Sequence, residues 1–133
     1  MKSLSIQTRH RCELVDITGQ VREAVRESRV DAGICVVYCP HTTAAVTINE
    51  NADPDVVSDL LMGLERMAPP NGPYRHTEGN SDAHLKSSLV GCSEQVLVQN
   101  GGLALGTWQG IYFCEFDGPR QRKVHVHVLS DSK

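Results

Sequence analysis

The chain has 133 residues, of which 40% are hydrophobic and 22% are charged, and its formal net charge is -3. This length and balance predict one globular domain, residues 1–133, and exclude a disordered or fibrous chain. The slight negative charge argues against a basic surface for a phosphate backbone, so we expect small-molecule partners and no nucleic acid.

The N-terminal residues lack the apolar stretch of a signal peptide, and no apolar run approaches the ~18 residues needed to cross a bilayer. We therefore expect a cytoplasmic protein that does not contact a membrane. The five cysteines include no C-x-x-C pair. Buried free thiols are the simplest interpretation, ahead of a disulfide framework or a zinc knuckle.

Along the first third of the chain, alternating residues 3–9 predict a half-buried strand. Apolar residues at helical spacing then predict a helix through Ser28 with Thr18 as its N-cap. The continuous apolar run 34–39 is typical of a central, fully buried strand, and Pro40 ends it.

The middle of the chain contains a strand prediction over residues 42–48 and two helix predictions. The first helix begins at Asp53-Pro54, a capping carboxylate followed by proline, and stops near Pro69-Pro70. The second begins with Ser81 or Asp82 as its cap and ends at Gly91, with Leu85 and Leu89 expected to point inward.

The C-terminal third is predicted to be β structure. Asn100-Gly101 favours a tight hairpin turn between residues 94–99 and 103–105, and the turn at 117–119 joins strands 110–116 and 122–129. We expect an α+β fold in which an antiparallel or mixed sheet carries two or three helices.

Polar groups interrupt this pattern in three segments, and such interruptions tend to mark functional sites. The first comprises residues 41–45 and 49–53. Structure alone also explains part of it, because Thr42 and Thr43 favour strands and Asp53 can cap a helix.

The second polar segment, residues 74–88, runs from a loop into a helix start. Backbone donors at a helix start favour an anion, and Lys86 adds positive charge, so a phosphate is a candidate ligand. A solvated loop whose serine and aspartate only cap the helix is the alternative.

The third segment is Gly106-Thr107-Trp108-Gln109-Gly110. Glycines inside a strand pattern often mark a bulge or a close approach to the backbone. Trp108, the only tryptophan, fits equally well as a core or subunit contact.

Histidines decide whether a metal site is expected. His41, His76 and His84 come from separate elements, and three imidazoles with an open position would suit zinc, whereas added carboxylates from Glu50 or Asp53 would suit magnesium. Each histidine alone is more often an ordinary surface or core residue. The pair His125 and His127 lies on one face of a strand, but a solvated or interface stripe is the favoured interpretation of it.

Four blocks of sequence together resemble the YjbQ-like family of small uncharacterised proteins. In chain order they are residues 41–44 (HTTA), 49–54 (NENADP), 80–88 (NSDAHLKSS) and 106–110 (GTWQG). The resemblance extends along nearly the whole chain.

The resemblance implies a compact α+β fold, a homotrimer with pockets near subunit contacts, and thiamine-phosphate synthase activity on a phosphorylated metabolite. It implies a divalent metal ion, zinc or magnesium, bound by His41, His76 and His84. The catalytic candidates are Glu50, Asp53, Lys86 and Glu115. The substrate-binding candidates are Thr42, Thr43, Asn49, Arg75, Asn80, Ser87 and Gln109.

Three functions are compatible with these residues. One is a metal-assisted transferase that joins a pyrimidinylmethyl diphosphate to a thiazole phosphate, with the divalent ion, Lys86 and Arg75 near the leaving group. Another is a metal-dependent hydrolase with Glu50 or Glu115 as base. The last is a module that binds a phosphorylated metabolite without turnover. The familiar thiamine-phosphate synthase is a (β/α)₈ barrel of about 250 residues, so a shared activity would be convergent.

Overall fold

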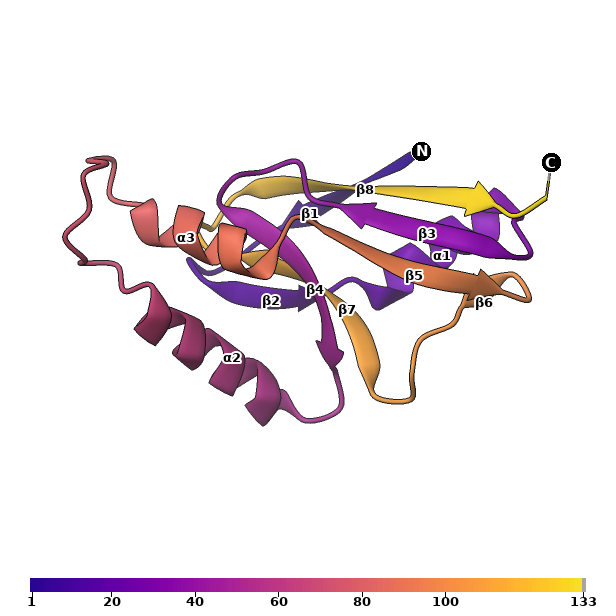
Figure 1. Cartoon of the computed structure of the whole chain (residues 1–133), viewed down its shortest axis with the longest axis horizontal. Helices are drawn as coiled ribbons and strands as arrows, with labels where there is room; N and C mark the ends of the chain where they lie inside the picture. Colours follow the sequence, from indigo (N-terminus) through magenta and orange to yellow (C-terminus); the bar gives the residue numbers. More distant parts are fainter. Residues whose placement is uncertain (133) are drawn as a thin grey trace.

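The computed structural model describes residues 1–132 of the chain. These residues form two antiparallel sheets and three helices (Figure 1). The larger sheet has the order β1 (Lys2–Gln7), β8 (Gln121–Ser130), β3 (Gly33–Tyr38), β5 (Ser93–Gln99) and β6 (Gly102–Leu103). The smaller sheet has the order β2 (Glu13–Asp16), β7 (Gln109–Glu115) and β4 (Ala44–Glu50). The helices are α1 (Thr18–Ser28), α2 (Pro54–Met67) and α3 (Ser81–Val90).

The main core lies between the two sheets and α1. Val37 of β3 and Val124 of β8 face Phe113 of β7 and Val46 of β4, and Val25 of α1 joins the same buried cluster. Each such side chain contributes about 1.5–3 kcal/mol when it is fully buried. Because alternate residues of a strand face opposite sides, the outer face of the larger sheet stays partly exposed, with Tyr38 and Leu97 on it.

Helix α3 covers one side of the smaller sheet and brings the second polar segment onto it. Ala83 of α3 packs with Ala45 of β4 and with Phe116 in a second buried cluster. Ser87 donates a hydrogen bond from its hydroxyl to the carbonyl oxygen of Ala44 at 2.7 Å. These contacts fix α3 against the start of β4, next to the segment that contains His41.

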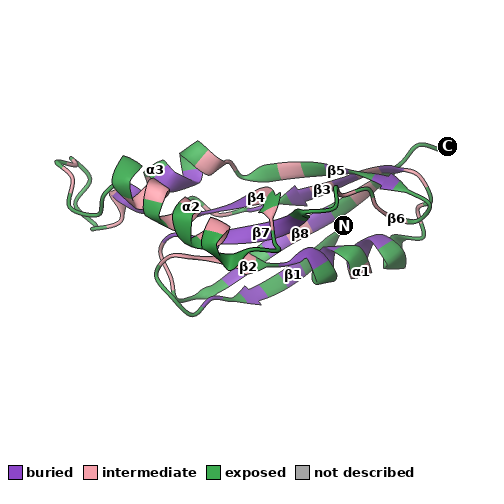
Figure 2. Ribbon diagram, turned by 90° about the horizontal axis from the view of Figure 1, so that it is seen from below, coloured by how far each residue is buried: buried purple, intermediate pink, exposed green. Residues whose placement is uncertain are grey.

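Helix α2 differs from the other two helices because it contains no buried residue. In Figure 2 it shows only half-buried and exposed positions, whereas α1 and α3 both show buried ones. Its apolar side chains at Leu60, Leu61 and Leu64 are only partly covered, and Met62 and Met67 are exposed. Leu64 packs against the second buried cluster, so the apolar face of α2 is partly covered among residues 1–132 and remains exposed at Met62 and Met67.

Several sequence predictions are confirmed. The α+β fold is correct, and all its strand pairs are antiparallel. Asp53 caps α2 by accepting a hydrogen bond from the Asp55 backbone N–H at 2.9 Å. Asn100 and Gly101 both have positive φ angles, 51° and 75°, as the turn between β5 and β6 requires.

Other predictions of local structure are wrong. Strand β2 was not expected, because four residues are too few for an alternation to be recognised. Thr18 is the first residue of α1 and not its cap; its hydroxyl donates to Asp16 and accepts from the Ile111 N–H. Strand β3 is central, but it is buried on one face only.

The predicted orientation of α3 is also wrong. Leu85 and Leu89, expected to point inward, are 44% and 56% exposed. The buried face instead carries Asp82, Ala83, Lys86 and Ser87, and Asn80 occupies the N-cap position. An ion-pair network makes this polar face the inner one, which no hydrophobic pattern indicates.

Candidate functional site

A groove runs along α3 and consists of two adjoining hollows, each of about 480 Å³. The first hollow is lined by Tyr74, Arg75, His76, Ser81, His84 and Leu85. The second is lined by His41, Thr42, His84, Ser87, Ser88, Gly91 and Cys92. Because His84 lines both hollows, we refer to them together as the α3 groove.

The first hollow lies where the loop before α3 folds back toward the helix. The Tyr74 hydroxyl donates to the carbonyl oxygen of Pro69, which holds the loop closed on itself. His76 Nδ1 lies 2.9 Å from the Ser81 hydroxyl, and its ring centroid lies 5.5 Å from that of His84, with the rings nearly perpendicular. Two of the three predicted metal ligands therefore meet here.

The second hollow brings in the third predicted histidine, His41, from the connection between β3 and β4. Its Nε2 accepts a hydrogen bond from the Lys123 backbone N–H at 3.0 Å, and its ring makes an edge contact with Phe113. Burial lowers the pKa of His41, and the nearby positive charge of Arg122 lowers it further. His41 is therefore neutral at neutral pH.

The charge of the groove suits an anionic ligand. Arg75 is the one charged side chain among the described lining residues, and no carboxylate lines either hollow. Glu78 lies outside the lining, with a carboxylate oxygen 3.7 Å from His76 Nε2. Imidazole and hydroxyl groups supply the remaining polar surface.

Thr43 and Glu115, two predicted site residues, both bind the buried side chain of Arg122, Glu115 as its ionic partner and Thr43 through hydrogen bonds. Arg122 Nε donates to a Glu115 carboxylate oxygen at 2.8 Å, and Arg122 Nη2 donates to the Thr43 hydroxyl at 2.9 Å. The Thr8 hydroxyl also donates to Glu115 at 2.8 Å. Glu115 and Arg122 are 0% and 3% exposed, and Glu115 lines neither hollow, so its carboxylate is not accessible from the groove.

Lys86, another predicted catalytic residue, points away from the groove. It is 1% exposed, and its Nζ lies 3.2 Å from Glu65 and 3.5 Å from Asp82. Arg11 forms two further hydrogen bonds with the Asp82 carboxylate, at 2.9 and 3.1 Å. Two residues along a helix correspond to about 200° of rotation, so Lys86 and His84 occupy opposite faces of α3.

Asn80 does not point into the groove either, since its side-chain amide donates to Asp117 at 2.8 Å.

Burial alone would raise the pKa of Asp82, but the hydrogen bonds and charge of Arg11, together with the charge of Lys86, outweigh burial and lower the pKa. The buried face of α3 therefore consists of groups already paired with one another.

The remaining predicted residues lie at the opposite end of β4. Asn49 pairs with Gly110 and Glu50 with Gln109 in the β4–β7 register, while Ala44 at the other end lies next to the His41 segment. A seven-residue strand spans about 20 Å. The structure does not bring Asn49, Glu50, Asp53 or Gln109 together with the three histidines within one chain.

Local contacts account for these four residues and for one glycine beside them. Gln109 accepts a hydrogen bond from the Gly106 N–H at 2.9 Å, and Glu50 accepts one from the Asp53 N–H at 3.3 Å. A side chain at Gly110 would collide with Asn51, which would lie 2.4 Å from its Cβ. The expected close approach at the glycine is thus made by a neighbouring side chain.

A metal ion does not fit the arrangement of the three histidines. Within residues 1–132, no group of three or more histidine, cysteine, aspartate or glutamate side chains is arranged to hold one. The Nε2 lone pair of His41 is already engaged by Lys123, and a ligand to a metal must offer a free lone pair. The metal site stays a prediction that this arrangement does not support.

Sequence reasoning missed Cys92, because all five thiols were expected to be buried. Cys35, Cys39 and Cys114 are buried, and Cys12 is half-buried, but Cys92 is exposed and lines the second hollow. It follows Gly91, whose positive φ of 103° ends α3. A cysteine directly after a helix-ending glycine was the available signal.

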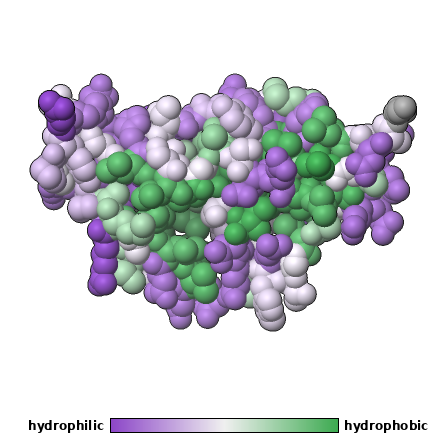
Figure 3. All heavy atoms as spheres, viewed as in Figure 1, coloured by the Kyte–Doolittle hydropathy of each residue, from purple (hydrophilic) through white to green (hydrophobic). Residues whose placement is uncertain are grey.

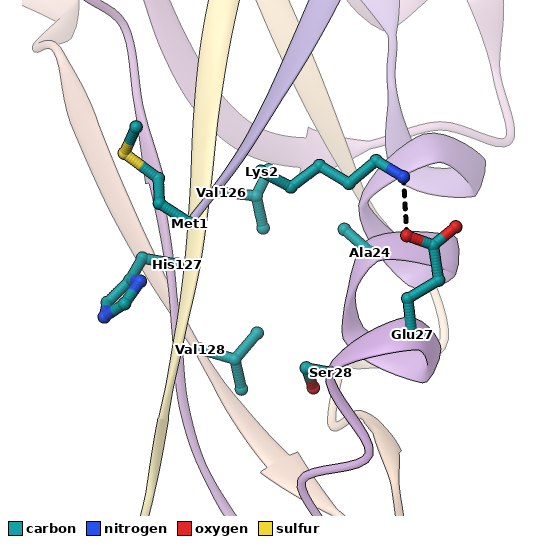
Figure 4. A pocket seen from close by; sticks show the side chains of 8 residues that line it. All are labelled: Met1, Lys2, Ala24, Glu27, Ser28, Val126, His127 and Val128. Atoms are coloured by element: carbon teal, nitrogen blue, oxygen red, sulfur yellow. Dashed lines mark hydrogen bonds and ion pairs between the residues drawn. The ribbon is translucent and has the colours of Figure 1, made fainter.

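A third hollow, of about 230 Å³, lies between α1 and the strands β1 and β8, away from α3 (Figure 4). An ion pair of 2.5 Å between Lys2 and Glu27 crosses one side of it. His127 is the one residue from the predicted histidine pair that lines it. His125, the other member, stacks on Tyr38 and contacts Ser3 instead.

The structure also bears on the expectation about membranes. None of the helices within residues 1–132 is both long enough and apolar enough to span a bilayer.

Comparison with known proteins identifies close relatives along almost the full length. The chain is 55% identical to UPF0047 protein MJ1081 of Methanocaldococcus jannaschii, over 95% of this chain and 91% of that protein. It is 52% identical to UPF0047 protein YugU of Bacillus subtilis, over 97% of this chain and 98% of that one.

Solved structures agree with this likeness. An uncharacterised protein of Clostridium acetobutylicum, described as belonging to the YjbQ/UPF0047 family, has a TM-score of 0.95 and 55% identity, covering 97% of this chain and 100% of that one. The family model "UPF0047 protein YjbQ-like" matches residues 2–131. The chain belongs to the YjbQ/UPF0047 family of uncharacterised proteins.

Proposed function

We propose that the α3 groove binds two small molecules, at least one of them phosphorylated, and joins them in a group transfer of the thiamine-phosphate synthase type. The observation that carries this proposal is that two hollows of equal size share one wall residue, His84. A transferase must hold two substrates with their reacting atoms in contact, and adjoining hollows provide that geometry.

The groove favours phosphate groups for electrostatic reasons. Arg75 can form paired hydrogen bonds with a phosphate, and the hydroxyls of Ser81 and Ser88 and the imidazole N–H groups are further donors. No carboxylate among the described lining residues would repel the anion. Donors placed around a leaving diphosphate stabilise the charge that develops on it.

The reaction balances without a redox partner or an external base. The C–O bond between the pyrimidinylmethyl carbon and its diphosphate breaks, and pyrophosphate leaves with the electron pair. The ring nitrogen of the thiazole phosphate then supplies its lone pair to form the new C–N bond. His84, at the junction of the hollows, donates to the leaving oxygen in this proposal, and Leu85 helps to exclude water.

The groove assigns different roles to the predicted residues. His41, Thr42, Arg75, His76 and His84 line it and are proposed to contact ligand, whereas Ser87 lines it but donates its hydroxyl proton to Ala44 and is proposed to hold α3 in place. Lys86 and Glu115 are proposed to stabilise the fold next to the groove through their buried ion pairs and not to contact ligand. No step is routed through a metal ion, and the hydrolase alternative loses support because it needs three imidazoles on one ion.

We also propose that the protein is a homotrimer, as the family resemblance implies. The partly covered apolar face of α2 supports association between copies, because half-exposed leucines and methionines are costly to leave in water. Figure 3 shows hydrophobic residues over the side of the molecule that carries α2 and α3 and also over the part that carries β3 and β5. Light scattering on the purified chain should return three chain masses; one chain mass would contradict the trimer.

A steady-state assay with purified protein and both substrates tests the proposed transfer. Wild-type protein should release thiamine phosphate and pyrophosphate together in equal amounts, and His84→Ala should lower the rate by at least a hundredfold. His10→Ala is the matched control, because His10 is exposed and lies outside both hollows. A wild-type rate no higher than that of His84→Ala would disprove the transfer, and ligand binding without turnover would leave a binding module.

A further inference from the structure

The orientation of the His41 ring is fixed by a hydrogen bond from the backbone N–H of Lys123. The Lys123 backbone N–H lies 3.0 Å from His41 Nε2, and a backbone N–H can only donate. Nε2 must therefore be the acceptor, with its lone pair directed at Lys123. Lys123 itself is held within β8, which pairs with both β1 and β3.

This contact determines where the imidazole proton resides. A neutral imidazole has one N–H and one acceptor nitrogen, so an accepting Nε2 places the proton on Nδ1. In a doubly protonated ring, the Nε2–H would face the Lys123 N–H, and two hydrogen-bond donors facing each other repel. Nδ1 has no hydrogen-bond partner among residues 1–132, and the ring lines the second hollow.

We propose that His41 serves the α3 groove as a neutral hydrogen-bond donor, through Nδ1–H, to an anionic oxygen of the bound ligand, and not as a metal ligand. The choice of ligand class rests on the proposed function, but the tautomer rests on the Lys123 contact alone.

Metal binding by His41 would require the surrounding structure to rearrange. Coordination through Nε2 would displace the Lys123 N–H and leave that backbone donor without a partner. Coordination through Nδ1 would need the other tautomer, whose Nε2–H would again face the Lys123 N–H. Neither nitrogen is available as the structure stands.

Hydrogen bonds to the neighbouring Thr43 hold the segment of His41 in the position that this tautomer requires. Arg122 donates to both the carbonyl oxygen and the hydroxyl of Thr43, at 3.2 and 2.9 Å, and the Phe116 N–H donates to the same carbonyl at 3.2 Å. These bonds fix the segment that carries His41 against β7 and β8. The buried positive charge of Arg122 also disfavours a second proton on the ring.

Nitrogen NMR of histidine-labelled protein tests the tautomer. At neutral pH, in the absence of ligand, His41 should show a protonated Nδ1 and an unprotonated Nε2. Added zinc should leave both His41 resonances in place. Protonation at Nε2, or a His41 resonance displaced by zinc, would overturn the inference.

Substitution tests the donor role with pyrophosphate as the probe. His41→Ala should weaken pyrophosphate binding roughly tenfold, as expected for a lost hydrogen bond to a charged group. His41→Asn keeps an N–H donor near the position of Nδ1 and should restore most of the affinity. Equal losses in both variants, or no loss in either, would overturn the donor role.

The two proposals can fail separately. Wild-type protein that binds no pyrophosphate would contradict the proposed function and the anionic ligand of His41. The nitrogen resonances would still decide the tautomer and the exclusion of a metal, because they are measured on the ligand-free chain.

Discussion

Both faces of α3 carry polar groups, but the two sets differ in what they contact. On the inner face, Asp82 and Lys86 are buried and paired with each other, with Glu65 of α2 and with Arg11 in the chain before β2. On the outer face, His84 and Ser88 line a groove and have no charged partner among residues 1–132. Buried charges that satisfy one another stabilise a fold, whereas accessible neutral donors remain free to bind a ligand.

The same contrast holds beneath the His41 segment. The Glu115–Arg122 pair is almost fully buried, and His41 above it is partly accessible. Residue type alone would have suggested the reverse, since Glu115 and Lys86 are stronger candidates for catalysis than serine or a neutral histidine. Changing each group in turn should separate stability from ligand binding.

The largest effect on stability is expected for Glu115→Gln. Removing the charge leaves Arg122 buried without its ionic partner, which should lower the free energy of unfolding at pH 7 by about 4 kcal/mol. Urea denaturation measures it. A loss below about 1 kcal/mol would show that the pair is not buried as the structure has it.

The pH dependence of the unfolding free energy tests the Glu115–Arg122 pair in a second way. Burial acts to raise the pKa of Glu115, but hydrogen bonds from Arg122, the Asp117 N–H and Thr8 outweigh it and lower the pKa. The folded carboxyl then protonates at a lower pH than the unfolded one. Its stabilisation is complete above the unfolded pKa, about 4.3, and is lost as the pH falls through the folded pKa. Glu115→Gln should flatten the acid side of the stability curve.

Lys86→Met should have the next largest effect. Methionine keeps most of the volume but leaves Glu65 unpaired and Asp82 with Arg11 alone, so we expect a loss of about 3 kcal/mol in unfolding free energy. Lys123→Met is the matched control on an exposed lysine and should change stability by less than about 0.5 kcal/mol. Equal effects of the two substitutions would contradict the assignment of Lys86 to the fold.

His84→Ala should show the opposite behaviour. Because His84 forms no ion pair within residues 1–132 and faces the groove, its removal should change stability by less than about 1 kcal/mol while abolishing turnover. Thermal unfolding and the transferase assay on one preparation measure both. A large loss of stability would show that His84 stabilises the fold, as Asp82 and Lys86 do.

The smallest effect concerns the reactivity of Cys92. This exposed thiol lines the second hollow, so pyrophosphate in the groove should slow its alkylation a few-fold. Peptide mass spectrometry distinguishes Cys92 from the half-buried Cys12, which lies on the other side of α3 and should be unaffected. Equal protection of both thiols would indicate a global change and not occupancy of the groove.

Much of the fold followed from patterns that local physics makes visible. Asp53-Pro54 predicted the start of α2, and Asn100-Gly101 predicted the β5–β6 turn, because each depends on neighbouring residues only. The inner face of α3 was not predictable in this way. Lys86 pairs with Asp82 of its own helix and with Glu65 of α2, and the residues around Lys86 give no sign of the contact with Glu65.

The candidate site was predictable in part for the same reason. His76 and His84 belong to one segment and lie together, and His41 reaches the adjoining hollow. Asn49 and Gln109 were grouped with them by family resemblance, but the direction of β4 places them at its other end. The direction of a strand depends on its pairing partners, which the spacing of residues along the chain does not encode.

The central claim is that the α3 groove binds a phosphorylated ligand through its histidines, and a pyrophosphate titration followed by histidine NMR tests it most directly. The chain has six histidines, three of which line the groove. The account predicts that the resonances of His41, His76 and His84 shift together with one dissociation constant while those of His10, His125 and His127 stay in place. Shifts confined to the second set, or equal shifts in all six, would contradict it.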